Sequence, residues 1–242
     1  MENPLLFLAL DVPDIHAAEV LVGKAGPNLT HVKVGLELFV AEGRAVVQVM
    51  RYRGKTILLD LKLHDIPETV ERTVRVMAAL GVDFITVHAA GGRPMLEAAV
   101  KGAAGSKIKV LAVTVLTSLD LKDLAAVGTT VKSIEWLVME RARLAKEAGC
   151  HGVIASPQEV GAIRIAVGGY GGRFLIITPG VRLLNGKENK DDQKRVGTPH
   201  SAIYAGADGI VVGRPIRDAA NPAEVVEFLF KEMNDAIPKQ SL

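Results

Sequence analysis

Short apolar runs rich in β-branched residues recur along the whole chain and alternate with longer amphipathic segments. Such runs are typical of strands in a parallel sheet, because those strands are covered on both faces and show no polar alternation. The pattern predicts strands at residues 5–11, 31–35, 56–62, 84–88, 109–116, 152–155, 174–178 and 209–213. The chain must therefore adopt a fold that accommodates regular strand–helix alternation.

An amphipathic segment follows each predicted strand, at residues 15–25, 43–53, 68–80, 94–101, 134–148, 157–167, 199–205 and 221–234. Asp14 is suited to cap the first helix, and Asn221-Pro222 to open the last. Strand–helix units repeated in this way over 242 residues predict a single-domain (β/α)8 TIM barrel spanning residues 1–242. A doubly wound open sheet is the alternative. It is disfavoured because Asp11-Val12-Pro13-Asp14, and no G-x-G-x-x-G motif, follows the first strand.

The composition argues against several classes of function. A net charge of +2, with no dense Lys/Arg tract, does not suit a nucleic-acid-binding protein. No apolar run is long enough to cross a membrane, and the first residues do not resemble a signal peptide. Cys150 is the single cysteine, which excludes an internal disulfide and suits a reducing compartment. We therefore expect a cytoplasmic protein in which Cys150 is a small buried residue.

Polar residues gather in or just after the predicted strands. They are Asp11, Lys33, Asp60, Lys62, His88, Thr117, Arg182 and Arg214. Barrels of this class build their active sites at the C-terminal ends of the strands. A ring of polar side chains there indicates a binding or catalytic site.

The third strand leads into the sequence Asp60-Leu61-Lys62-Leu63-His64-Asp65-Ile66-Pro67. Because side chains alternate between the faces of a strand, Asp60 and Lys62 share one face, and Asp65 has the opposite parity. A solvent-exposed ion pair at a strand end is the simpler interpretation. The position at the catalytic end of a barrel favours a chemical role instead.

Gly213-Arg214-Pro215 follows the eighth strand. The loops after strands 7 and 8 of such barrels often bind a phosphate, and the guanidinium of Arg214 suits that dianion. A long polar segment after strand 7, at about residues 180–198, is either a solvated surface loop or a mobile lid over the phosphate. Arg182 and Gln193 within this segment are candidate phosphate or substrate contacts.

Together these motifs resemble the orotidine 5′-monophosphate decarboxylase family over nearly the whole chain. The matching segments are Ala9-Leu10-Asp11, Lys33-Val34-Gly35, the third-strand motif continued through Glu68-Thr69, Leu116-Thr117-Ser118, Pro179-Gly180-Val181-Arg182, Asp191-Asp192-Gln193-Lys194-Arg195 and Val212-Gly213-Arg214-Pro215-Ile216. The third-strand motif and the final Gly-Arg-Pro-Ile are the most specific. Leu63 and Glu68 replace residues that are often Phe and Asn in the family, at positions not expected to touch the chemistry.

The resemblance implies decarboxylation of orotidine 5′-monophosphate (OMP) to uridine 5′-monophosphate (UMP), the last step of UMP biosynthesis, without metal or organic cofactor. It implies that Lys62 stabilises and then protonates the C6 carbanion. Asp60 would lie beside the departing carboxylate or orient Lys62. Lys33, Asp60, Lys62 and Asp65 would form an alternating charge network that keeps Lys62 charged.

The resemblance also implies a set of substrate-binding residues: Asp11, Lys33, Asp60, Thr69, Thr117, Arg182, Gln193, Gly213 and Arg214. Asp11 and Lys33 would contact the ribose hydroxyls, and Thr117 would contact the pyrimidine. The residues after strands 7 and 8 would hold the phosphate.

A homodimer with composite active sites is implied as well, in which each subunit donates Asp65 and Thr69 to its partner's site. His64 and His88 are interpreted as structural polar residues near the mouth of the barrel rather than as acid–base catalysts.

Two alternative functions stay open from the sequence. The 3-keto-gulonate 6-phosphate decarboxylases and hexulose phosphate synthases resemble this chain in the Asp-x-Lys-x-x-Asp motif. They use Mg²⁺ and place a Glu at the position of Lys33, where a cation would repel the metal. A non-catalytic barrel that binds a nucleotide phosphate is the second alternative. Such a binder would not need Asp60, Lys62 and Asp65 together, so the metal-free decarboxylase is favoured.

Overall fold

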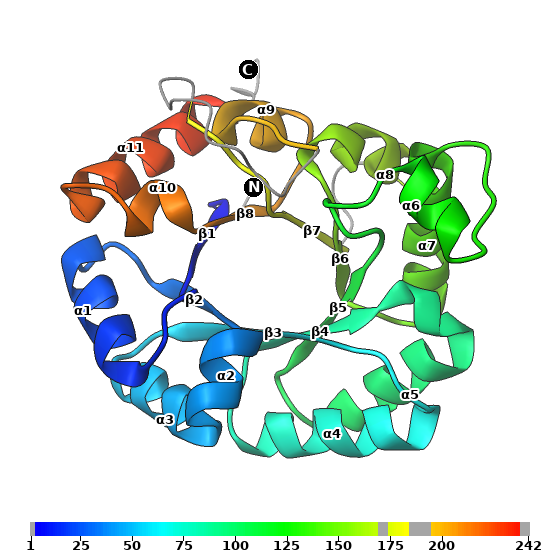
Figure 1. The fold of residues 1–242 in the computed structure, drawn as a ribbon, viewed down its shortest axis with the longest axis horizontal. Helices are drawn as coiled ribbons and strands as arrows, with labels where there is room; N and C mark the ends of the chain where they lie inside the picture. The colour runs from blue at the N-terminus through cyan, green and yellow to red at the C-terminus, as the bar shows by residue number, and fades with distance from the viewer. Residues whose placement is uncertain (1–2, 169–173, 184–194, 238–242) are drawn as a thin grey trace, which may run out of the picture.

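Parallel strands paired in sequence order close into a barrel (Figure 1). The fold is that of a computed structural model, which describes residues 3–168, 174–183 and 195–237. The strands are β1 (Leu5–Ala9), β2 (His31–Gly35), β3 (Thr56–Leu63), β4 (Phe84–His88), β5 (Lys109–Val113), β6 (Gly152–Ile154), β7 (Leu175–Thr178) and β8 (Gly209–Val212). The predicted (β/α)8 barrel is confirmed, and the open sheet is excluded.

Helices form a ring outside the strands (Figure 1). They are α1 (Ile15–Ala25), α2 (Leu36–Glu42), α3 (Arg44–Tyr52), α4 (Pro67–Ala79), α5 (Gly92–Ala103), α6 (Leu121–Ala126), α7 (Ile134–Glu147), α8 (Val160–Ala166), α9 (Pro199–Tyr204), α10 (Arg214–Arg217) and α11 (Pro222–Asp235), with the 3₁₀ helices η1 (Ala89–Gly91) and η2 (Pro157–Glu159). Asp14 caps α1 as predicted, since its side chain accepts a hydrogen bond from the backbone N–H of Ala17. Asn221 precedes α11 but makes no capping hydrogen bond through its side chain.

The predicted segments are all found as strands or helices, but several ends differ. β1 stops at Ala9 and β5 at Val113, earlier than predicted, and Asp11 and Leu116 lie beyond these ends, where they line a pocket at the mouth of the barrel. Residues 157–167 form η2 and α8 rather than one helix. The helices α2, α6 and α10 were not predicted. Each has seven residues or fewer, about two turns at most, so its apolar stripe repeats too few times to identify a helix.

Strand alternation divides the hydrophobic core into two parts. The inner part fills the barrel with Phe7, Ala9, Leu58, Phe84, Leu111, Val113, Ile154, Ile177 and Val211. The outer part lies between the strands and the helices and includes Leu6, Leu8, Ile57, Leu59 and Ile85. Leu58 therefore faces inward while Ile57 and Leu59 face outward, as the parity of the third strand predicted. Asp60 and Lys62, on the parity of Leu58, are directed towards the barrel interior.

Two further expectations concern the single cysteine and membrane-spanning helices. Cys150 is buried, and burial raises the pKa of its thiol to about 12, so it acts as a small apolar residue. Within the described part of the chain, no helix combines the length and the apolar character required to cross a membrane.

The helices α4 and α5 pack closely because Gly102, on α5, has no side chain. A Cβ atom built at this position would overlap the backbone carbonyl oxygen of Glu71 and lie 3.0 Å from Cβ of Val74. Backbone atoms of a neighbouring helix cannot move aside as the end of a flexible side chain can. Gly102 therefore fixes the distance between the two helices, one of which begins two residues after Asp65.

We predict that Gly102→Ala lowers the free energy of unfolding by about 1–3 kcal/mol, because the added methyl group overpacks this contact. Gly161→Ala, in α8, is the matched control, since a Cβ atom there meets no atom within 4 Å. Both substitutions bring the same gain in helix propensity, up to about 1 kcal/mol. Urea unfolding of the two variants measures the difference; equal stabilities would contradict the close packing.

Candidate active site

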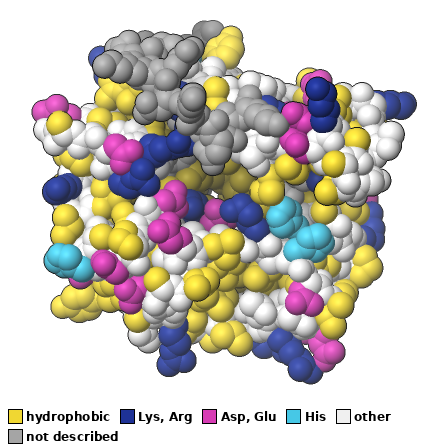
Figure 2. Space-filling model, in the orientation of Figure 1, with side chains coloured by type: hydrophobic (Ala, Val, Ile, Leu, Met, Phe, Trp, Pro, Cys, Tyr) yellow, Lys and Arg dark blue, Asp and Glu magenta, His cyan; other side chains and the backbone are white. Residues whose placement is uncertain are grey.

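A cavity of about 420 Å³ opens at the C-terminal mouth of the barrel. Figure 2 shows side chains of both charges gathered around this central hollow. The lining residues are Ala9, Asp11, Lys33, Leu58, Asp60, Lys62, Val113, Val115, Leu116, Thr117, Ile154, Ala155, Pro179, Gly180, Arg182, Val211, Gly213, Arg214 and Arg217. The site therefore contains all of the strand-end residues predicted from the sequence except His88. Its size and its concave shape suit a small-molecule ligand.

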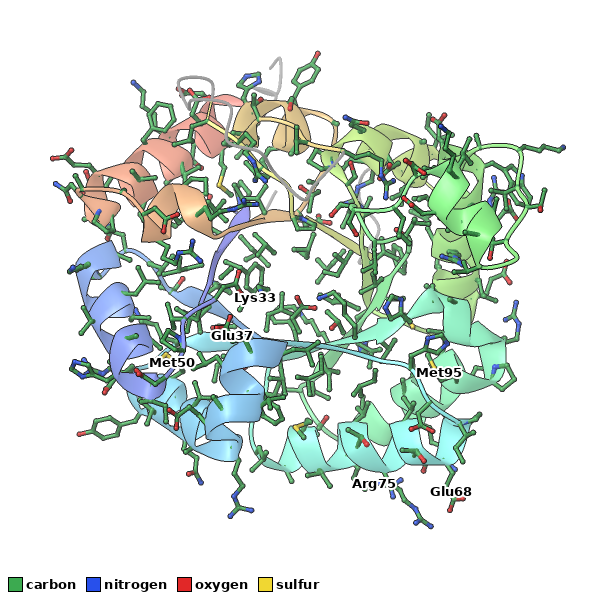
Figure 3. The ribbon with its side chains drawn as sticks, in the orientation of Figure 1. Lys33, Glu37, Met50, Glu68, Arg75 and Met95 are labelled. Atoms are coloured by element: carbon green, nitrogen blue, oxygen red, sulfur yellow. The ribbon has the colours of Figure 1, made fainter. Side chains whose placement is uncertain are left out.

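Asp60 lies between two lysines at one side of the cavity. Its Oδ2 atom accepts a hydrogen bond from Lys62 Nζ at 2.8 Å and lies 3.6 Å from Lys33 Nζ. Lys33 projects from β2 towards the middle of the ring of strands (Figure 3) and also donates to Asp11 Oδ1 at 3.1 Å. The side chains of Lys33 and Asp60 are only 12% and 13% exposed, so water screens these charges weakly. The result is a chain of alternating charges: Asp11, Lys33, Asp60 and Lys62.

Burial on its own would raise the pKa of Asp60. The charges of Lys33 and Lys62, with hydrogen bonds from Lys62 and Thr86, outweigh that effect and hold the pKa below its usual value. Asp60 is therefore a carboxylate at neutral pH.

Lys62 has an unusual backbone conformation. Its φ is +50°, and it is the one residue other than glycine with positive φ in the described ranges. The left-handed region disfavours residues with a Cβ atom by about 1–2 kcal/mol and is found where surrounding contacts enforce it. Here the register of β3 against β4 is interrupted between Leu59 and Leu63, which gives the strand a bulge. The bulge carries Lys62 at the mouth of the barrel.

Arginines line the cavity at the ends of β7 and β8, across the barrel from β3. Arg182 follows β7, and Arg214 begins α10 directly after Gly213. Arg217, one turn further on, donates to the backbone oxygen of Asp11 at 3.2 Å and pairs with Asp218. Guanidinium groups and backbone N–H groups at this place are typical of a phosphate site.

Apolar side chains line the cavity as well. They include Leu58, Val113, Leu116, Ile154 and Val211. Thr117 is a further lining residue, in the loop that follows β5. The cavity therefore offers cationic, anionic and apolar contacts to a ligand.

Some predicted site residues do not line the cavity of this chain. Asp65 is exposed, and its Oδ1 atom accepts a hydrogen bond from the backbone of Ile66 at 2.6 Å. Thr69 is exposed on α4. Gln193, with residues 184–194 of the predicted lid, lies outside the described residues.

The two histidines of the third-strand region lie next to each other, outside the cavity lining. The ring centroids of His64 and His88 are 5.5 Å apart. Burial lowers the pKa of His88, and the charges of His64, Lys62 and Arg141 add to that effect. His88 is therefore neutral at neutral pH. Among the described residues, no three His, Cys, Asp or Glu side chains are grouped so that they could hold a metal ion.

The two ends of the predicted lid segment are joined to each other. Val181 and Gly197 form an isolated β-bridge, in which Arg182 N donates to Gly197 O at 2.9 Å. Next to this bridge, the buried side chain of Arg195 forms an ion pair with Glu159 and donates to Leu116 O at 2.9 Å. The base of the segment is thereby fixed to the loop that carries Thr117.

Three residues with a part in the site were not identified from the sequence: Thr86, Arg195 and Arg217. Parity along β4 places Thr86 on the inner face with Phe84, so a polar residue there was a usable signal. Arg195 appeared in the sequence analysis only as the last residue of the matching segment that begins at Asp191, and no role was assigned to it. Its pairing with Glu159 joins segments 36 residues apart and leaves no local pattern.

We predict that Arg195→Met lowers the free energy of unfolding by about 3–5 kcal/mol at pH 7, because it leaves the Glu159 carboxylate buried without its partner. Burial already raises the pKa of Glu159, and Arg195 offsets only part of that rise. A carboxyl with a raised pKa in the folded state binds a proton more readily there than in the unfolded chain. The deficit relative to wild type therefore shrinks as the pH falls towards about 5.

The double variant Arg195→Met/Glu159→Leu is the control, since it removes both charges and is expected to recover most of the lost stability. Chemical denaturation at several pH values measures all three proteins. A deficit below about 1 kcal/mol, or one that does not change with pH, would contradict this role of the ion pair.

Comparisons with known proteins agree with the geometry. The sequence profile of the orotidine 5′-phosphate decarboxylase / HUMPS family matches residues 4–228. The chain is 52% identical over 215 residues to an orotidine 5′-phosphate decarboxylase of Anaeromyxobacter sp. (strain K), covering 89% of this chain and 92% of that protein. It is 44% identical over 232 residues to one of Bradyrhizobium sp. (strain ORS 278), covering 96% and 92%. The crystal structure of orotidine 5′-phosphate decarboxylase from Lactobacillus acidophilus is similar with a TM-score of 0.84 at 36% identity, covering 96% of this chain and 100% of that one.

Proposed function

This chain belongs to the orotidine 5′-phosphate decarboxylase / HUMPS family, and we propose that its cavity converts OMP to UMP and CO₂ in pyrimidine nucleotide biosynthesis without a metal or organic cofactor. The observation that carries the proposal is the Asp60 carboxylate between the ammonium groups of Lys33 and Lys62, across the barrel from the arginines. The anionic phosphate of OMP suits the arginine side, and its carboxylated pyrimidine suits the Lys62 side.

Lys62 is the proposed catalytic residue. Loss of CO₂ leaves an electron pair on C6, a ring carbon with no adjacent carbonyl group to accept it. An ammonium group fixed near C6 stabilises that charge, and more strongly in a site shielded from water. The same ammonium then transfers a proton to C6, which gives UMP and a neutral lysine that regains its proton from solvent.

Asp60 has two proposed effects on this step. Its hydrogen bond to Lys62 orients the ammonium group. Its negative charge would also lie beside the carboxylate of the bound substrate, so that departure of CO₂ relieves a repulsion between the two groups. Both effects depend on Asp60 staying ionised, which agrees with its lowered pKa.

The remaining lining residues are proposed to bind the substrate. Asp11 and Lys33 contact the ribose hydroxyls, and Thr117 contacts the pyrimidine. Arg182, Gln193, Gly213 and Arg214 hold the phosphate. We further propose that residues 180–198 act as a lid over the phosphate, anchored at the Val181–Gly197 bridge. Binding energy from the phosphate then supports closure and positioning at a distance from C6.

The name of the family also covers the HUMPS enzymes, so the family alone does not select the reaction. The Mg²⁺-dependent alternative needs hard oxygen ligands free to bind a cation. In this chain Lys33 Nζ lies 3.6 Å from one oxygen of Asp60 and hydrogen-bonds to Asp11, so an ammonium group takes the place that a metal would need. This favours the metal-free decarboxylation, as do the names of the relatives.

The first test follows the absorbance of OMP as purified protein converts it to UMP, in the presence of EDTA. We predict that turnover is unaffected by EDTA and that Lys62→Ala lowers kcat/KM by at least about a thousandfold, because charge stabilisation and proton transfer are both lost. Lys231→Ala, which removes an exposed lysine on α11, is the control and retains wild-type activity.

A folded wild-type protein without turnover would contradict the proposed function. Activity that disappears in EDTA and returns with Mg²⁺ would favour the metal-dependent alternative.

We also propose that the protein is a homodimer with composite active sites. Asp65 and Thr69 are exposed beside Ile66, which is itself 65% exposed. Val40 on α2 is 79% exposed, and α2 and α4 lie on the same side of the barrel (Figure 1). Exposed apolar side chains of this kind favour a surface that a second copy covers. Asp65 would then enter the partner's cavity beside Lys62 and extend the alternating charges.

A complementation experiment tests this arrangement. Lys62→Ala and Asp65→Ala are each predicted to be inactive as homodimers. After denaturation and refolding together, half of the dimers are mixed, and each mixed dimer contains one site with both native residues. We predict recovery of about a quarter of wild-type activity, since a two-fold dimer pairs each site with residues of the other subunit. A mixture with no recovered activity would contradict the composite site, as would a monomer in sedimentation.

The cellular location is likewise a proposal. We propose a cytoplasmic enzyme because Cys150 is the single cysteine of the sequence, so the chain has no internal disulfide and suits a reducing compartment.

A further inference from the structure

Thr86, on β4, is a buried polar residue that the proposed reaction does not use. It is fully buried, with an exposed fraction of 0%, and it does not line the cavity. Its hydroxyl group nevertheless contacts two parts of the catalytic strand. It donates a hydrogen bond to Asp60 Oδ1 at 2.9 Å and accepts one from the backbone N–H of Lys62 at 2.8 Å.

These two hydrogen bonds lie at the place where the sheet loses its regular pairing. Leu59 pairs with Ile85, and Leu63 pairs with Val87, so that three residues of β3 face Thr86 alone on β4. A strand with extra residues leaves backbone groups without partners in the ladder. The hydroxyl of Thr86 supplies the missing partner for Lys62 N, at the residue whose φ is +50°.

The same hydroxyl also restricts Asp60. One carboxylate oxygen of Asp60 is held by Thr86, and the other accepts from Lys62 Nζ and faces Lys33. With both oxygens engaged, the carboxylate plane cannot rotate without breaking a hydrogen bond. Thr86 thus contacts the backbone of Lys62 and the side chain that orients its ammonium group.

We propose that Thr86 is a positioning residue for the decarboxylation, and that its hydroxyl group sets the geometry of the Asp60–Lys62 pair through the bulge of β3. The proposal rests on the proposed function, because its readout is the turnover of OMP. It adds a role for a residue outside the cavity, which acts through Asp60 and Lys62 and touches no substrate.

The test compares Thr86→Val with Thr114→Val. Thr114 is also fully buried, and its hydroxyl donates to the backbone oxygen of Ile154 at 3.1 Å on the neighbouring strand, away from the charge network. Both substitutions exchange a buried hydroxyl for a methyl group and remove at least one buried hydrogen bond. Only Thr86→Val removes contacts to Asp60 and Lys62.

We expect Thr86→Val to lower kcat by roughly ten- to a hundredfold, the size of effect that a misplaced catalytic group produces. The dissociation constant for UMP, measured by calorimetry, stays within about twofold of wild type, since the arginine side of the cavity is unchanged. Thr86→Ser keeps the hydroxyl and restores kcat. Thr114→Val keeps kcat for each folded molecule.

Several outcomes would overturn the proposal: an unchanged kcat in folded Thr86→Val, an equal loss in Thr114→Val, or no restoration by serine. If Thr86→Val does not fold, the pair Thr86→Ser and Thr86→Ala decides, because both lack the methyl group and differ only in the hydroxyl. Absence of OMP turnover in wild type would contradict the proposed function, whereas a normal wild type with active Thr86→Val would contradict this inference alone.

Discussion

The Asp60 carboxylate is the group on which the site depends. It is almost enclosed by protein and lies within hydrogen-bonding distance of Lys62 and close to Lys33. An isolated buried carboxylate costs several kcal/mol of solvation, and so does an isolated ammonium group. In combination the opposite charges offset each other's cost, which the lowered pKa of Asp60 reflects. The barrel brings these charges together because β2 and β3 are neighbours whose inward positions meet at the same mouth.

The other lining residues of the cavity can hold a substrate next to Asp60 and Lys62. Arginines line the cavity at the ends of β7 and β8, and apolar side chains form another part of its lining. A nucleotide whose phosphate is bound by the arginines would place its base at Lys62. The phosphate contacts would then supply binding energy at a distance from the reacting carbon. The strained backbone of Lys62 agrees with such a role, because proteins keep strained residues where the surrounding contacts impose a functional geometry.

The sequence predicted those parts of the structure that follow from local periodicity. Strand alternation placed Asp60 and Lys62 on one face, and both line the cavity. Asp65 lies outside the cavity of its own chain, but β3 ends at Leu63, so the parity of the strand does not explain its position. The bulge of β3 could not be predicted, since it depends on register against β4. Thr86 lies 26 residues from Asp60, so their hydrogen bond leaves no local pattern. The short helix α2 also lacked a signal, because it starts at Leu36 directly after β2, without an intervening loop.

A crystal structure of the protein with UMP bound would decide whether Lys62 is placed to protonate the substrate. We expect C6 of the pyrimidine to lie about 3–3.5 Å from Lys62 Nζ, the distance required for proton transfer between positioned groups, and the phosphate to contact Arg182 and Arg214. We also expect Asp60 to keep its contacts with Lys33 and Lys62. A pyrimidine directed away from Lys62, or a phosphate bound at the lysine side of the cavity, would contradict the proposed role of Lys62.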